Sequence, residues 1–252
     1  MFRTRFLILF FWFYCSLTAI PALASDETST ILYTYHHKPP FIVDEKKRIG
    51  LYYDLATYFN NKLTGHTFST EYLPRKRLDY LLKINALNGF VVGVSPIWFN
   101  DKKEQKYLWL DTIYQDRDEF VSLKQTPFEF KQSQSLKGKA VAGVAGYYYH
   151  GINEMVSKGQ TLRIDTINEK NVLSIIEKGR ADVGIVSVSV FKYLNKLDKL
   201  DNIYHFSEIP HDAFDRRVMT TQSQEKVYKQ LLPIINTMMQ DREWLKMINK
   251  YQ

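Results

Sequence analysis

Two short segments of this sequence are apolar at almost every position. They are Phe90–Val94, which reads FVVGV, and Asp182–Val186, which reads DVGIV. A short run that is apolar throughout is typical of a strand buried on both faces, as in a parallel sheet that helices cover on both sides. Because stretches with helical spacing lie between such strands, the pattern predicts an α/β fold with doubly wound sheets.

The other expected elements continue this alternation. Apolar runs predict strands at Ile31–Tyr35, Thr67–Tyr72 and Ala140–Val144. Helices are expected at Asp54–Leu63, after Pro74, at Val188–Leu194 and from Gln224 to the end. Another helix should follow the capping-box pattern Thr166-x-x-Glu169 and have Gly179 as its C-cap. Pro233 must kink or divide the last helix. Two less regular runs, Leu108–Tyr114 and Glu119–Leu123, indicate the approach to a crossing between two halves.

Residues 38–63 have a distinctive order of strand, turn and helix signals. Pro39 and Pro40 stop any helix and hold the chain extended. A charged turn follows, and Gly50 then supplies backbone freedom. Asp54 stands at the N-cap or in the first turn of the predicted helix, where its charge suits the positive end of the helix dipole.

The first 24 residues have the pattern of a signal peptide. Arg3 and Arg5 form a positive n-region, Phe6–Ile20 is an apolar stretch too short for a comfortable membrane span, and Ala22–Ala24 reads small-x-small. An uncleaved anchor is the alternative. Cleavage would remove the two arginines and lower the formal net charge from +7 to +5. It would also remove Cys15, the one cysteine of the sequence, which excludes disulfides and cysteine–metal sites in the mature chain.

Several motifs appear in an order that is known from one protein family. The first half has Pro39-Pro40-Phe41 and then Gly50-Leu51-Tyr52-Tyr53-Asp54-Leu55. The second half has Leu136, Gly138, Lys139, Val141, Val144 and Gly146 in order, then Gly179-Arg180-Ala181-Asp182, and a last helix with Trp244, Leu245, Ile248 and Tyr251. In these motifs the chain resembles the extracellular (periplasmic) solute-binding protein family of the amino-acid-type ABC transporters. The resemblance spans essentially the whole mature chain.

The resemblance implies a fold of two α/β lobes, each a doubly wound sheet, with the ligand cleft between them. Lobe 1 would contain residues 30–117 and 214–252, and lobe 2 would contain residues 118–213. In such a fold the ligand lies at the loops that follow the carboxyl ends of the strands.

The chain departs from this family at three positions that bear on the ligand. Amino-acid-binding members carry Thr-x-x-Arg after the third strand, and that Arg clamps the α-carboxylate; here Asn100–Lys106 reads NDKKEQK and contains no Arg. Ser187 or its neighbour replaces the Asp that those members use for the α-ammonium, and Lys38 replaces the aromatic residue before Pro-Pro. An ordinary α-amino acid is therefore not the expected ligand.

The candidate ligand-binding residues come from the loops that would meet in the cleft. They are His37, Lys38, Arg75, Arg77, Ser95, Trp98, Gly146, Tyr147, Tyr148 and Ser187. Aromatic rings suit a planar or cationic group. The amides after Gly146 are expected to open a helix and so to suit an anion.

Most of these residues also have a purely structural explanation. One or two of the three tyrosines at 147–149 would pack in the core, each arginine would lie on a solvated helix, and Trp98 would be a core residue. Since His36 and His37 are adjacent on an extended segment, they should point to opposite sides, so that one of them faces the cleft.

Three function classes follow from these features. The first is a periplasmic solute-binding protein that captures a small polar or aromatic molecule and delivers it to an ABC permease. The second is a ligand-sensing partner of a membrane receptor. The third is a secreted dehydratase-like enzyme with Glu104, Asp116 or His37 as acid or base, although none of the common catalytic motifs occurs in the sequence. We expect no metal or other cofactor, no nucleic-acid partner, and a monomer.

The signal-peptide pattern predicts cleavage after Ala24, because the small-x-small site ends there. Intact-mass analysis of protein recovered from the periplasm tests this. The expected mass lacks residues 1–24; a mass that includes them would contradict the prediction, and retention in the membrane would favour the anchor.

Overall fold

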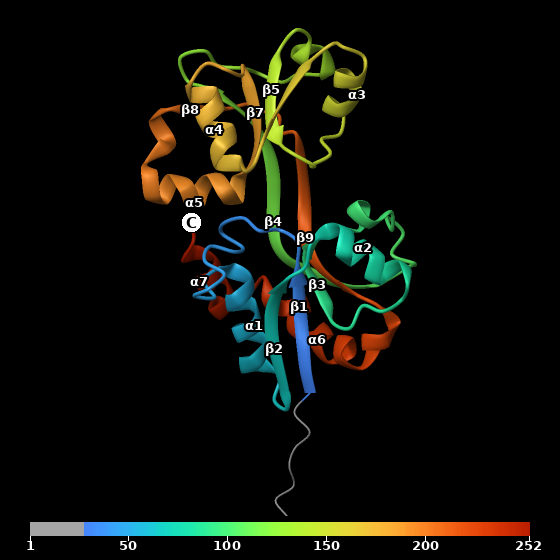
Figure 1. Cartoon of the computed structure of the whole chain (residues 1–252). Helices are drawn as coiled ribbons and strands as arrows, with labels where there is room; N and C mark the ends of the chain where they lie inside the picture. Colours follow the sequence, from blue (N-terminus) through green and yellow to red (C-terminus); the bar gives the residue numbers. More distant parts are fainter. Residues whose placement is uncertain (1–27) are drawn as a thin grey trace, which may run out of the picture.

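The computed structural model describes residues 28–252 and has two α/β lobes, one above the other in Figure 1. The lower one, lobe 1, contains both ends of the described chain, and the upper one, lobe 2, contains its middle part. The predicted signal peptide lies outside the described residues. None of the described helices combines the length and the apolar character that a membrane crossing needs.

Lobe 1 is a mostly parallel sheet with helices packed against it. Its elements are β1 (Thr28–Thr34), α1 (Leu51–Lys62), β2 (His66–Tyr72), α2 (Arg75–Lys83), β3 (Phe90–Val94), α6 (Glu225–Met238) and α7 (Arg242–Asn249). β1 lies between β2 and β3 and is parallel to both. β3 is the predicted FVVGV strand, and all five of its residues are buried, as expected for a strand with both faces covered.

Lobe 2 repeats this architecture. Its elements are β5 (Ala140–Val144), α3 (Ile152–Ser157), β6 (Leu162–Thr166), α4 (Glu169–Glu177), β7 (Val183–Ser187), α5 (Val188–Asp198) and β8 (Tyr204–Phe206). β5 is parallel to both β6 and β7. β7 is the second of the predicted apolar strands and is likewise buried throughout.

Two strands, β4 (Leu108–Leu123) and β9 (Asp212–Thr220), join the lobes (Figure 1). β9 pairs with β3 on one side and with β4 on the other, while the far end of β4 pairs with β7 and β8. The two runs expected in the β4 region are therefore one strand of 16 residues, because different partners satisfy its two halves. Our expected lobe boundaries fall inside β4 and β9 at the paired residues Arg117 and Ala213, and we keep them as the proposed division.

Each lobe has its own hydrophobic core. In lobe 1 the largest cluster gathers around Phe41, Phe59 and Trp244, and in lobe 2 separate clusters gather around Val186 and Phe120. Partly buried Tyr193 of α5 packs against cores of both lobes. Most apolar contacts therefore stay within one lobe.

The segment after β1 is fixed by backbone hydrogen bonds to the start of α1. The amides of Leu51 and Tyr52 donate to the carbonyls of Pro40 and Phe41, at 2.8 and 3.1 Å. A Cβ atom at Gly50 would lie 2.3 Å from the Phe41 carbonyl oxygen, so only glycine fits at this turn. The helix begins at Leu51, and Asp54 lies in its first turn as predicted.

Two helix ends differ from the prediction. The N-cap of α4 is Asn168, whose side chain accepts from the Asn171 amide at 2.9 Å, so Thr166 and Glu169 do not form a capping box. The carboxylate of Glu169 is directed elsewhere. In the last helical region Pro233 lies inside α6, and the division into α6 and α7 comes after Met238, where Asp241 caps α7.

Gly93→Ala should destabilise the protein much more than Gly65→Ala. Both glycines have a positive φ, but a Cβ at Gly93 would lie 1.6 Å from the Tyr52 hydroxyl, whereas a Cβ at Gly65 would meet nothing within 4 Å. Backbone strain alone costs about 1–3 kcal/mol and overpacking adds about 1–3 kcal/mol. At roughly 2–4 °C per kcal/mol, thermal unfolding should separate the two variants clearly. Equal melting temperatures would contradict this packing.

Candidate functional site

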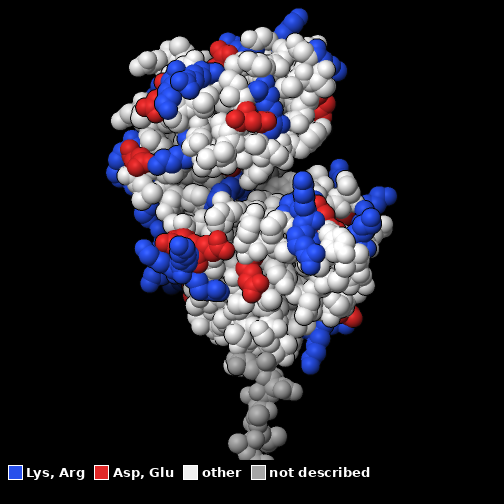
Figure 2. Space-filling view, viewed as in Figure 1, with Lys and Arg blue, Asp and Glu red and all other residues white. Residues whose placement is uncertain are grey.

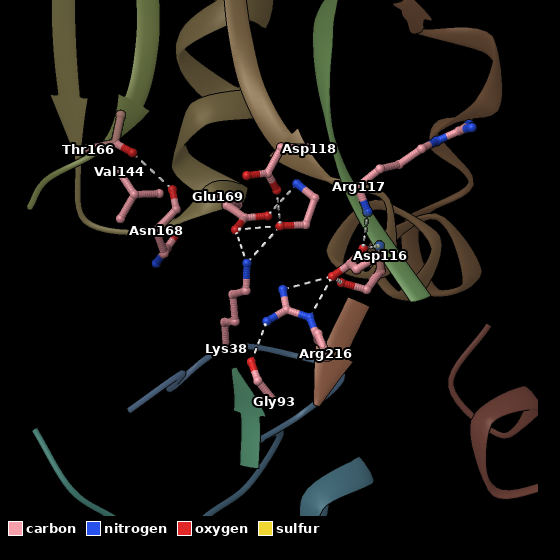
Figure 3. Close-up of polar contacts among 12 residues, drawn as sticks. Lys38, Gly93, Asp116, Arg117, Asp118, Val144, Thr166, Asn168, Glu169 and Arg216 are labelled. Carbon is pink, nitrogen blue, oxygen red and sulfur yellow. Dashed lines mark hydrogen bonds and ion pairs between the residues drawn. The ribbon is translucent and has the colours of Figure 1, made fainter. Parts of the chain in front are cut away.

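A lysine from lobe 1 crosses the space between the lobes. Lys38, in the segment after β1, places its Nζ 2.5 Å from Glu169 Oε1 and 2.7 Å from Ser187 Oγ, both in lobe 2 (Figure 3). The side chains of Lys38 and Glu169 are only 10% and 5% exposed. Burial disfavours the charged ammonium, but the Glu169 carboxylate, together with Tyr147 and Asp118, more than offsets this and raises the pKa of Lys38. The result is a buried ion pair between the two lobes.

The acceptors for this ammonium are organised by lobe 2 itself. Glu169 begins α4, and its Oε2 accepts from the backbone amide of Ser187 at 2.9 Å. The Ser187 hydroxyl lies 2.8 Å from Asp118 Oδ1 and 3.2 Å from Glu169 Oε1. The hydroxyl has a single proton and cannot donate to both carboxylates at once, and the Lys38 ammonium supplies a further donor to Glu169.

A second buried ion pair lies where the lobes join. Arg216 of β9 donates to Asp116 of β4 through Nε at 2.9 Å, and its Nη2 lies 2.8 Å from the same oxygen. Both side chains are almost completely buried. Ser189, at the start of α5, donates its hydroxyl to Asp116 at 2.7 Å. Burial disfavours the carboxylate, but Arg216 and then Lys38 hold the pKa of Asp116 below its usual value.

Aromatic rings line the lobe-1 side of this site. Trp98 packs edge-on against His36 and against Phe214, with ring centroids 5.6 and 4.9 Å apart. Arg75 donates to the Trp98 carbonyl at 2.8 Å and to the Tyr35 hydroxyl at 3.3 Å, so it positions these residues. His36 is buried, and its Nδ1 has no hydrogen-bond partner.

The three consecutive tyrosines of lobe 2 have different environments. Tyr147 is 37% exposed and its ring centroid lies 5.8 Å from Lys38 Nζ, which places it at the site. Tyr148 is 68% exposed and donates to Glu154, directed away from Lys38. Tyr149 is a core residue whose hydroxyl accepts from the Val144 amide at 3.0 Å.

The molecular surface is hollowed between the lobes, with basic side chains visible inside (Figure 2). Beside the crossing strands a cavity of about 790 Å³ is lined by residues of both lobes, among them Ser95, Ile97, Val188 and Phe214. Lys38, Glu169, Ser187, Trp98 and Tyr147 are not among the residues that line this cavity. We call the space between the lobes around these five residues the interlobe cleft.

Other predicted site residues lie outside this group. His37 points outward to Glu45, at 3.3 Å, and Arg77 lies over the exposed Tyr80. Gly146 is exposed in a turn, and because α3 begins only at Ile152, the amides after Gly146 do not open a helix. The structure thus brings together Lys38, Ser187, Tyr147 and Trp98, with Arg75 behind the rings.

The segment 100–106 is a turn organised by an acid. Asp101 accepts from the amides of Gln105 and Lys106 at 2.8 and 3.0 Å and from the Trp109 indole at 2.8 Å. Glu104 pairs with Arg217 of β9 through both carboxylate oxygens. These contacts account for the two acids of the segment without a ligand.

Four residues of the site were missed or left open by the sequence. Glu169 was assigned to a cap, Arg216 was not considered, Asp116 was considered only as a catalytic acid, and His36 was left open beside the candidate His37. The alternation of buried and exposed residues along a strand provides a signal for two of them. Asp116 and Arg216 lie on the buried side of their strands, two residues from the apolar Tyr114 and Val218 on the same side. A charge at such a position is normally paired.

His36 should make folding stability depend on pH between about 6.5 and 5.5. Burial, and then the charges of Arg216, Lys38 and Arg75, hold its pKa well below the usual value, so the folded state does not take up the proton that the unfolded state binds. Stability is complete above the unfolded pKa of about 6.5 and is lost as the pH falls.

Urea unfolding at pH 7.5 and 5.5 tests this. Relative to His36→Gln, the wild-type protein should lose about 1.4 kcal/mol more on acidification. His37→Gln, at the exposed neighbour, is the control and should behave as wild type. Identical pH dependence of the wild-type and His36→Gln proteins would contradict the buried neutral imidazole.

The fold and site can now be compared with known proteins. No protein-family model and no curated protein sequence matches the chain. Solved structures do match it. An ancestral arginine-binding protein bound to arginine has a TM-score of 0.66 at 15% identity, covering 90% of this chain and 99% of that one. A substrate-binding protein of an amino acid ABC transporter has a TM-score of 0.62 at 19% identity, covering 88% and 98%.

A ligand-binding core of another name matches equally well. The GluR0 ligand-binding core from Nostoc punctiforme, in complex with (L)-glutamate, has a TM-score of 0.63 at 13% identity and covers 88% of this chain and 98% of that one. At identities of this size the likeness concerns the fold alone. The chain therefore has the two-lobe fold found in periplasmic solute-binding proteins and in this ligand-binding core.

Proposed function

We propose that this protein is a periplasmic solute-binding protein, a member of the family it resembles, that closes two lobes over a small polar or aromatic molecule and delivers it to an ABC permease. The observation that carries the proposal is the interlobe cleft, to which lobe 1 contributes Trp98 and lobe 2 contributes Tyr147. A ligand that contacts both lobes favours the closed arrangement, and a permease can recognise that arrangement.

The ligand class follows from what the cleft offers. The rings of Tyr147 and Trp98 suit a flat or partly apolar molecule, and hydroxyl groups supply hydrogen bonds. The arginines near the cleft already have partners, since Arg216 is paired with Asp116 and Arg75 donates to Asp79 and to the Trp98 carbonyl. These two arginines are therefore not free to clamp an α-carboxylate, and we do not expect the common amino acids to bind tightly.

The second candidate is a ligand-sensing partner of a membrane receptor, which would report its bound ligand to that receptor instead of to a permease. The GluR0 ligand-binding core, in complex with (L)-glutamate, shares this fold. Catalysis is the least supported candidate. Asp116 is held as a paired carboxylate, Glu104 pairs with Arg217, and His37 lies outside the cleft, so none of the three is available as an acid or base in it.

The remaining features of the proposal concern location and assembly. The predicted signal peptide supports export to the periplasm, where the protein would meet its permease or receptor and no cytosolic nucleic acid. The separate core of each lobe suits a monomer. We propose no resident cofactor.

A thermal-shift screen of small solutes tests the proposed function. A ligand at about a hundred times its Kd should add roughly 2.7 kcal/mol of stability, which corresponds to several degrees in melting temperature. Tyr147→Ala should remove the shift while changing the unliganded melting temperature little, because the ring is partly exposed.

Tyr148→Ala is the matched control, since its ring points away from the cleft and pairs with Glu154. It should keep the shift. A screen in which no solute stabilises the wild-type protein, or submicromolar binding of a common amino acid in calorimetry, would contradict the proposed function or the proposed ligand class.

A further inference from the structure

The position of Lys38 suggests a further role in selecting the ligand. Its ammonium comes from lobe 1, yet its two hydrogen-bond partners, Glu169 and Ser187, belong to lobe 2 (Figure 3). In the cleft of a binding protein, a ligand normally makes such contacts between lobes. Here the chain itself places a cation against the buried carboxylate of Glu169.

The Lys38 ammonium already occupies the position against Glu169 and Ser187 that a ligand ammonium would need. Glu169 and Asp118 both contact the Ser187 hydroxyl, and Lys38 is the cation that contacts this group. The nearby Arg216 is neutralised by Asp116. A ligand ammonium would have to displace Lys38 from Glu169 and bury two like charges within a few ångströms, which is strongly unfavourable.

The ring of Tyr147 lies on another side of the Lys38 ammonium. Its ring centroid lies 5.8 Å from Lys38 Nζ, so the ring covers the ammonium that is already present. The part of Tyr147 that stays exposed is available to a ligand lying beside Lys38. Such a ligand meets an aromatic face and a cation whose charge is partly compensated.

We propose that Lys38 is the specificity-determining residue of the cleft: its ammonium substitutes for a ligand cation between the lobes, so the cleft selects ligands that have no ammonium group. The inference rests on the proposed function, because it names the ligand class of the same cleft. The same ion pair ties lobe 1 to lobe 2 without any ligand.

Complementation with a small amine tests this role without the natural ligand. Lys38→Ala removes the ammonium and leaves Glu169, Ser187 and Asp118 in place. Adding n-propylammonium chloride should then restore a cation to the position of Nζ. The melting temperature of Lys38→Ala should rise by about 3–6 °C at an amine concentration ten times its Kd. The wild-type protein should not respond, because its own lysine fills the position.

Three controls make the test specific. Tetramethylammonium chloride at the same ionic strength carries the charge but no N–H donor and should have no effect. Lys38→Met fills the path of the side chain with apolar atoms and should not respond to propylammonium. The double variant with Lys38→Ala and Glu169→Gln should lose most of the response, because the main acceptor charge is gone.

A folded Lys38→Ala protein that responds to propylammonium no more than the wild type, or equally to tetramethylammonium, would overturn the proposal. If Lys38→Ala does not fold in plain buffer, purification with propylammonium present should yield folded protein, and failure there would also overturn it. A solute screen that finds no ligand for the wild type would remove the proposed function but would leave a positive amine response intact.

Discussion

The buried ion pair between Asp116 and Arg216 joins β4 and β9, the two strands that connect the lobes. Each residue belongs to a strand that crosses from lobe to lobe, and their side chains are almost fully buried. Taking two charges out of water is expensive, and removing one partner of such a pair typically costs about 3–5 kcal/mol. The pair is supported from both lobes, since Arg216 donates to the Gly93 carbonyl of β3 and Ser189 of α5 donates to Asp116. These contacts fix how the crossing strands enter each lobe.

The junction also helps to position the segment that carries Lys38 in the cleft. Arg216 lies with its guanidinium carbon 4.4 Å from the ring centroid of Phe41, in the segment that also carries Lys38. That segment is held against α1 by the hydrogen bonds of Pro40 and Phe41, so Lys38 projects toward lobe 2. The two buried ion pairs are neighbours with different tasks. Asp116 and Arg216 hold the junction, and Lys38 and Glu169 join the lobes across the cleft.

Much of the fold could be predicted from the sequence, because the signals are local. The two apolar strands, the turn at Gly50 and the first-turn acid Asp54 depend on their own neighbours, and the structure confirms them. Of the site, Lys38 and Ser187 were expected separately as cleft residues, and the structure places them 2.7 Å apart. Their contact joins residues 149 positions apart in the sequence, and no local pattern contains that information.

The features that were missed also have a physical reason. Glu169 fits a capping box by spacing, but Asn168 supplies the cap and leaves the carboxylate to Lys38 and to the Ser187 amide. The tyrosines at 147–149 look alike in sequence, and only the packing of Tyr149 beneath Gly143 decides which of them reaches the cleft. Charged residues inside apolar strands are the signal that would have found the junction, since a charge placed there needs a partner.

The central claim is that the lobes move as bodies about β4 and β9, and that the pair of Lys38 and Glu169 holds them together without ligand. Spin labels at Lys76 of α2 and Ser157 of α3, both exposed, measure the distance between the lobes directly by pulsed electron resonance. The unliganded protein should include a short-distance population held by this ion pair. In Lys38→Met the distribution should shift to longer distances, with each lobe still folded. An unchanged distance distribution in Lys38→Met would contradict this role of the ion pair.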